Sequence, residues 1–342
     1  MKIKLTILTL FINIAAFSQA KLIREEYINP NPEEKSCHAS TIVELTKSSL
    51  MAAWFAGEHE NHYKVCIWAS TFSNGNWSKA TKIADGIVNG TQYACWNPVL
   101  FKSKEGKLFL FYKVGVNPRE WWGMMKTSTN DGKTWSEPIR LPDNILGPIK
   151  NKPIQLASGE ILHPSSTESL DSKIWKAHVE ISDANAQNWK KIDIENGEYG
   201  VIQPSLLTYP DGKIQMLLRS RQNNIIQSWS SDNGKSWGKL SPINLQNPNS
   251  GIDAVTLMNG SHVLIYNPLP SGNKWSNGRN ILKVAISKDG INWTDIYELE
   301  NKDKSEYSYP AVIQTQDGLI HITYTYDRKL VKYVVLQVPT EK

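Results

Sequence analysis

The chain has 342 residues, of which 38 are basic and 33 acidic, so its net charge of +5 is small and spread along the sequence. It has no run of Lys and Arg that would follow a phosphate backbone, which argues against a nucleic-acid-binding protein. A slightly basic pocket for an acidic small substrate remains compatible with this charge.

The N-terminus predicts an export signal. Lys2 and Lys4 precede an apolar run from Leu5 to Phe17, and small residues follow up to Ala20. This pattern is typical of a secretory signal at residues 1–20, cut after Ala20, and the apolar run is too short for a membrane span. We therefore expect a mature chain of residues 21–342 that is periplasmic or secreted, forms a single domain and does not span a membrane.

Three cysteines, Cys37, Cys66 and Cys95, follow without CxxC spacing. One disulfide with a free thiol is possible in an exported chain, but three unpaired cysteines are the favoured interpretation. Their spacing does not predict a metal site, and the sequence predicts no cofactor.

Strand-like segments fill the rest of the chain. After a first candidate strand, Lys21 to Tyr27, pairs of apolar segments joined by short Gly-containing turns recur six times, and no stretch has helical periodicity. The six predicted hairpins span residues 40–57, 98–115, 152–166, 204–221, 253–268 and 310–327.

A second pattern alternates with the hairpins. SSDNGKSW ends at Trp237, STNDGKTW at Trp135 and ISKDGINW at Trp293, and two degenerate copies end at Trp77 and Trp189. The tryptophans are roughly 50 residues apart, which indicates a repeat architecture. Five such turns for six hairpins predict an all-β, six-bladed β-propeller in which an N-terminal strand completes the C-terminal blade and closes the ring.

These S-x-D-x-G-x-x-W turns resemble the Asp boxes, or BNR repeats, of the sialidase superfamily, from about Cys37 to the C-terminus. The copy at 230–237 fits the pattern fully, and the others fit it with altered spacing. The resemblance implies a propeller fold. The boxes themselves are expected to stabilise turns on the outer side of the blades, so Asp232 is predicted to have a structural role.

A ligand site in a propeller is expected where first strands start and second strands end, around the central channel. The residues predicted at first-strand starts are His38, Asn97, Lys152, Gln203, Asp253 and Tyr309. Those predicted at second-strand ends are Glu58, His59, Lys113, His163, Arg219, Arg221, Tyr266, Asn267, Tyr324 and Asp327.

The resemblance implies three arginines for a carboxylate, a Tyr/Glu nucleophilic pair and an acidic proton donor. Tyr309 resembles the nucleophile, Arg219 the second arginine and Arg279 the third. His38 stands where the first arginine is expected and Gln203 where the glutamate is expected. No Asp stands in the acid loop, GEHENH, which instead offers Glu58, Glu60, His59 and His62.

The basic residues favour an anionic substrate, since Arg219 presents a planar fork that matches a carboxylate, and Lys113 and Lys152 add charge. The leading hypothesis is β-elimination (by a lyase or dehydratase) on a uronate-containing oligosaccharide, with proton transfer by His163 and Tyr309 and with His38 as a further catalytic candidate.

Two other functions stay open. Glu58 and Asp253 are candidates for the carboxyl pair of an exo-acting glycoside hydrolase, sialidase-like or acting on rhamnose or uronate. A non-catalytic glycan-binding propeller would use tryptophans such as Trp96, Trp121 and Trp122 as stacking platforms. In all three cases we expect a monomer, with an acidic oligosaccharide as the ligand and Asn97 in the binding site.

Overall fold

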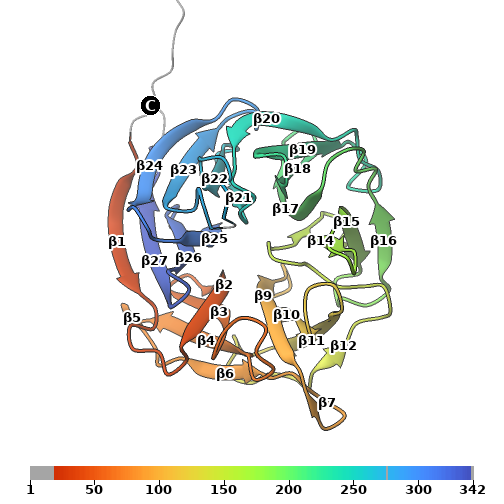
Figure 1. Cartoon of the computed structure of the whole chain (residues 1–342), viewed down its shortest axis with the longest axis vertical. Coiled ribbons are helices and arrows are strands. Elements are labelled where there is room, and N and C mark those ends of the chain that lie inside the picture. Colours follow the sequence, from red (N-terminus) through yellow and green to blue (C-terminus); the bar gives the residue numbers. More distant parts are fainter. Residues whose placement is uncertain (1–18, 275, 340–342) are drawn as a thin grey trace, which may run out of the picture.

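The computed structural model describes residues 19–274 and 276–339, and in this part of the chain every regular element is a strand. Figure 1 shows six sheets arranged radially around a centre, which confirms the predicted six-bladed β-propeller. The predicted signal at residues 1–20 lies almost wholly outside the described residues. No helix in the described ranges is long and apolar enough to cross a bilayer.

Each blade is an antiparallel sheet whose strands follow one another from the centre outward. The first three blades comprise β2 (Ser36–Thr46), β3 (Ser49–Gly57), β4 (Cys66–Ser73), β5 (Asn76–Trp77) and β6 (Thr81–Ala84); β9 (Ala94–Lys102), β10 (Leu108–Gly115), β11 (Trp122–Ser128) and β12 (Ile139–Arg140); and β13 (Ile154–Gln155), β14 (Ile161–Glu168), β15 (Trp175–Ser182) and β16 (Lys190–Asp193).

The last three blades comprise β17 (Val201–Thr208), β18 (Ile214–Ser220), β19 (Asn224–Ser230) and β20 (Ser241–Gln246); β21 (Asp253–Thr256), β22 (His262–Tyr266), β23 (Ile281–Ser287) and β24 (Thr294–Asn301); and β25 (Tyr307–Gln314), β26 (Ile320–Tyr326), β27 (Leu330–Gln337) and β1 (Lys21–Tyr27). A small hairpin of β7 (Ile87–Val88) and β8 (Thr91–Gln92) lies between blades 1 and 2.

The ring closes as predicted, because β1 pairs antiparallel with β27 as the outer strand of blade 6 (Figure 1). Lys332 on β27 is buried and contacts the carboxylates of Glu25 on β1 and Glu300 on β24. Tyr324 also donates a hydrogen bond to Glu300, at 2.7 Å. The first and last strands are therefore joined by a sheet and by an ionic cluster, of which Lys332 and Glu300 are buried and Glu25 is partly exposed.

The Asp boxes are turns between third and fourth strands, as predicted. In the fullest copy, Ser230 Oγ donates to Asp232 at 2.8 Å and accepts the Gly234 amide at 2.9 Å. Gly234 has a φ of +79°, and a Cβ there would lie 2.3 Å from Leu162 of the neighbouring blade. Trp237 packs on the apolar cluster shared by blades 3 and 4. The boxes thus fix turns and blade contacts.

All three cysteines are free, which confirms the favoured interpretation. Cys37 and Cys95 are buried, and burial raises the pKa of the Cys37 thiol to about 12. These two thiols are therefore packing groups of the blades and stay protonated at neutral pH.

Candidate functional site

A repeated irregularity presents side chains at the centre. In blades 1, 2, 4 and 6, two residues of the first strand lie opposite one residue of the second. The first residue of each bulge has a positive φ: 53° for Ala39, 34° for Asn97, 55° for Gln203 and 53° for Tyr309. Left-handed backbone costs a non-glycine residue about 1–3 kcal/mol, so such strain is often associated with a functional site.

Gln203, Arg219 and Tyr309 form the core of the candidate site. Arg219 Nη1 donates to the Tyr309 hydroxyl oxygen at 2.7 Å and to Gln203 Oε1 at 3.1 Å. Gln203 Nε2 also donates to the Tyr309 oxygen, at 3.1 Å. Sequence reasoning grouped these residues correctly, since blades 4 and 6 bring them together although 106 positions separate Gln203 from Tyr309.

Two further arginines adjoin this core. Arg279 Nη2 donates to the Asn249 carbonyl at 2.9 Å, while the Asn249 side chain accepts Arg219 Nε at 2.8 Å, so one residue positions both guanidinium groups. Glu306 Oε1 accepts Arg279 Nη1 at 3.3 Å and Arg328 Nε at 3.1 Å. Burial, and next the charge of Arg219, lowers the pKa of Arg279 to about 10.

The structure therefore confirms that Arg279 lies in the same cluster as Arg219, and it adds Arg328, Asn249 and Glu306, which sequence reasoning missed. Arg328 directly follows Asp327, which had been expected at the channel end of blade 6. This neighbour could have indicated Arg328. Asn249 lies in a loop, NPNSG, that carries no comparable pattern.

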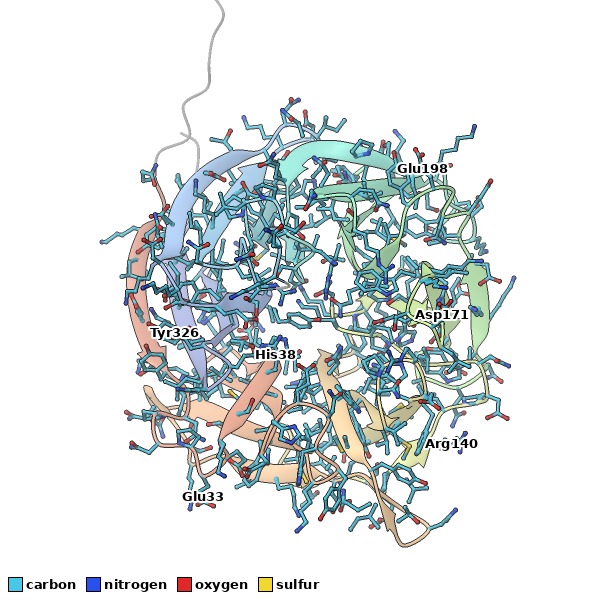
Figure 2. All side chains as sticks on the ribbon, viewed as in Figure 1. Glu33, His38, Arg140, Asp171, Glu198 and Tyr326 are labelled. Carbon is cyan, nitrogen blue, oxygen red and sulfur yellow. The ribbon has the colours of Figure 1, made fainter. Side chains whose placement is uncertain are left out.

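His38 lies near the centre of the ring, at the inner end of β2 (Figure 2). Its ring centroid is 4.0 Å from that of Tyr309, and its Nδ1 is 2.9 Å from the Thr325 hydroxyl. Burial, and next the charge of Arg328, holds the His38 pKa well below its usual range. His38 is therefore neutral at pH 7, and its Nε2 makes no hydrogen bond to the described residues.

Lys150 lies against Tyr309, with its ammonium nitrogen 5.7 Å from the centre of the Tyr309 ring. Its ammonium group donates to Asn151 Oδ1 at 2.8 Å, to the Ile252 carbonyl at 2.9 Å and to the Pro310 carbonyl at 2.5 Å. Burial lowers the Lys150 pKa to about 7, with Asp253 opposing. The sequence indicated Lys152, two residues later. Both lysines precede β13, which begins at Ile154, and Lys152 pairs with Asp253 instead of lying against Tyr309.

The loop between β3 and β4 brings one carboxylate to the cluster. Glu60 accepts Arg328 Nη1 at 2.7 Å. Glu58 points elsewhere, because it pairs with Lys35 at 2.5 Å and is half exposed. Of the two carboxylates in GEHENH, Glu60 is therefore the one that contacts the arginine cluster.

His163 is a wrong prediction. It is fully buried, its ring centroid is 4.4 Å from that of Trp189, the tryptophan of an outer Asp box, and its Nε2 bonds Ser182 at 2.8 Å. The cause is strand length, since β14 runs to Glu168 and places position 163 well below the rim. His163 belongs to the packing between blades 2 and 3.

Lys113 is also wrongly placed by sequence reasoning. It is fully buried, with its ammonium group on the Pro148 carbonyl, and burial lowers its pKa to about 7.

Trp96 is 2% exposed and donates to the Gly115 carbonyl at 3.0 Å, so it offers no stacking face to a sugar. Asn97 lies in the bulge of blade 2, with 5% of its surface exposed.

The predicted hydrolase pair is not formed. Asp253 accepts Lys152 Nζ at 2.7 Å, Ser205 Oγ at 2.9 Å and the Val312 amide at 2.9 Å, so its carboxylate is used in joining three blades. Glu58 pairs with Lys35 instead, and in the described part of the chain it makes no hydrogen bond or ion pair to Asp253. In the described ranges, no group of three or more His, Cys, Asp or Glu side chains is placed to hold a metal.

The cluster can bind an anion beside a tyrosine hydroxyl. Among the described residues, Arg219 bonds only the neutral groups of Asn249, Gln203 and Tyr309, so no carboxylate compensates its positive charge. Arg219 Nη2 makes no hydrogen bond to the described residues, so this donor can reach a ligand while the rest of the group holds Tyr309. The geometry suits a carboxylate next to a reacting carbon.

Comparison with known proteins gives consistent results. The family described as "BNR repeat-like domain" matches residues 48–322. A sialidase of Bacteroides fragilis is 22% identical over 310 residues, covering 78% of this chain and 54% of that protein. An anhydrosialidase of Macrobdella decora is 23% identical over 224 residues, covering 58% of this chain and 29% of that protein. The chain thus spans about half or less of the length of these relatives.

A solved structure supports the same fold. The NanB sialidase from Streptococcus pneumoniae superposes with a TM-score of 0.70 at 14% identity, over 94% of this chain and 70% of that one. At this identity the likeness concerns the fold alone.

Proposed function

Because the chain belongs to the BNR repeat-like family of the sialidase superfamily, we propose that it is an exo-acting glycoside hydrolase that removes a terminal sugar bearing a carboxylate. The observation that carries the proposal is the contact of 2.7 Å between Arg219 Nη1 and the Tyr309 oxygen. A carboxylate bound by Arg219 would lie beside the Tyr309 oxygen, so the proposed substrate carries its carboxylate close to the carbon that Tyr309 faces.

In this reaction Arg219, Arg279 and Arg328 hold the carboxylate and exclude uncharged sugars. The Tyr309 oxygen attacks the anomeric carbon and its proton passes to solvent, while the Arg219 guanidinium stabilises the negative charge on that oxygen. Water then cleaves the glycosyl–tyrosine bond and releases the sugar. Glu60 of the β3–β4 loop gives up its pair with Arg328 when the substrate carboxylate binds there, takes a proton from solvent and donates it to the leaving oxygen. The names of the two relatives, a sialidase and an anhydrosialidase, support a substrate of this class.

Gln203 modifies this mechanism. Its Nε2 donates to Tyr309, whereas a carboxylate at the same position would accept the tyrosine proton. The chain therefore positions Tyr309 but supplies no base beside it, and slow turnover on simple glycosides is expected.

β-Elimination is a second candidate, because a neutral His38 lies against Tyr309 and no carboxylate does. His163 has no part in it. One incubation separates the alternatives, using a sialylated and a uronate-terminated oligosaccharide. Free acidic sugar without new ultraviolet absorbance supports hydrolysis, absorbance from an unsaturated uronate supports elimination, and saturable binding without product supports a binding propeller. Tyr309→Phe should abolish product formation in either enzyme.

A further inference from the structure

A groove lies between blades 2 and 3, with a volume of about 530 Å³. Its walls come from the β10–β11 connection, the β12–β13 connection and the C-terminal end of β14. Figure 2 shows Arg140, one of its residues, toward the periphery of the ring and His38 near the centre, so the groove lies radially outward from the candidate site.

The groove has the composition of a carbohydrate site. Trp121 and Trp122 are partly buried, and the Arg140 guanidinium lies 5.3 Å from the centre of a Trp122 ring. Aromatic surface beside planar polar side chains matches a sugar, which has apolar C–H faces and a rim of hydroxyls. The polar groups of the groove are Arg119, Arg140, Asp143, Asn144, Glu168 and Lys191.

Charges in the groove are mostly compensated, unlike those at the centre. Arg140 lies 3.5 Å from Asp143, and Lys191 lies 3.1 Å from Asp193. Glu168 accepts the indole N–H of Trp175 at 3.1 Å. The groove therefore offers hydrogen bonds without a strong net charge, which favours a neutral sugar over a second anion.

Trp175 connects the groove to the candidate site. The centre of its ring lies 5.3 Å from the Arg219 guanidinium carbon, and its indole N–H donates a hydrogen bond to Glu168, which lines the groove. Trp121 packs on the same apolar cluster as Tyr309. Through Trp175 and Trp121 the groove therefore adjoins the candidate site.

We propose that this groove is a subsite for the leaving part of the substrate, and that it binds one or two neutral hexose units next to the acidic terminal sugar. The inference rests on the proposed function. It predicts that the chain prefers oligosaccharides to glycosides with a small aryl leaving group.

The test fills the groove without removing buried side chains. Thr167 is exposed and lines the groove, so Thr167→Trp inserts bulk there; Leu170 is 73% exposed, lies three positions away and is not part of the lining, so Leu170→Trp is the matched control. With 3′-sialyllactose, Thr167→Trp should lower kcat/KM at least about tenfold, which corresponds to ~1.4 kcal/mol. With the aryl glycoside of the same sugar, both variants should stay within about twofold of the parent chain.

Equal losses on the two substrates, or no loss on either, would overturn the subsite. If neither substrate turns over, the proposed function fails and the subsite is tested by binding, with lactose as the probe and saturation-transfer NMR as the readout. Transfer to lactose in the parent and in Leu170→Trp, but not in Thr167→Trp, supports the subsite. Transfer that is absent from the parent, or unchanged in Thr167→Trp, overturns it.

Discussion

Gln203→Glu is expected to increase hydrolysis. Gln203 is 4% exposed, accepts Arg219 Nη1 at 3.1 Å and donates to the Tyr309 oxygen at 3.1 Å. The substitution keeps the shape of the side chain and its contact with Arg219. The atom facing Tyr309 changes from a donor to an acceptor, so the hydroxyl must donate to it, and Tyr309 then has a base to take its proton.

The magnitude follows from two opposing effects. A positioned general base contributes about 10²–10⁴ in rate. Burying a carboxylate has a cost, but the Arg219 guanidinium 3.1 Å away offsets much of it. We expect the lower end of that range, an increase in kcat of about 10², which is ~2.7 kcal/mol in activation free energy.

The assay follows release of a fluorescent phenol from an aryl sialoside, with kcat and KM measured across pH. Thermal unfolding of each variant checks the fold, and the double variant with Tyr309→Phe is the control, because it removes the group that the new carboxyl serves. An unchanged or lower kcat in a folded protein, or a gain that persists in the double variant, would refute the reasoning.

Three more outcomes are expected. Arg219→Lys keeps the charge but loses the fork, so kcat/KM should fall about 10²-fold or more for an acidic sugar and much less for its methyl ester, and equal losses would contradict carboxylate binding. Glu60→Gln should abolish turnover of substrates with poor leaving groups but spare aryl glycosides with acidic phenols, because only the former need a proton on the leaving oxygen. Measured kcat values for both substrates check this, and equal losses would contradict the role of Glu60. Lys332→Met leaves the buried carboxylate of Glu300 without its ammonium partner and should lower the free energy of unfolding by about 3 kcal/mol in urea titrations, a loss below ~1 kcal/mol being inconsistent with the ion pair.

Stability should also depend on pH through buried histidines. Burial, and next the charge of Lys113, depresses the His163 pKa in the folded chain, so the unfolded chain binds more protons below about pH 6.5. The contribution is therefore present above pH 6.5 and is lost as the pH falls, by up to about 2 kcal/mol at pH 5. His163→Phe should flatten this part of a urea-midpoint profile, and an unchanged slope would argue against a neutral His163.

Much of the fold could be predicted from the sequence, because Asp boxes and hairpins are local patterns that recur. The site was predictable where its residues stand near strand starts, as Gln203 and Tyr309 do, or near strand ends, as Arg219 does, and where the family resemblance indicated a residue, as for Arg279. His163 failed because β14 continues to Glu168, so that position 163 lies well inside the strand instead of at its end. Asn249 and Glu306 could not have been found, since each acts by holding arginines whose positions depend on the packing of blades.

The pairing of β1 with β27 bears on how the chain folds. These strands are separated by almost the entire described sequence, and contacts of such separation form late, because the loop between them must first be ordered. Blades 1 to 5 are built from neighbouring segments, whereas blade 6 carries Tyr309 and Arg328. A nascent or partly unfolded chain therefore lacks a complete arginine cluster at its centre until blade 6 has closed on β1.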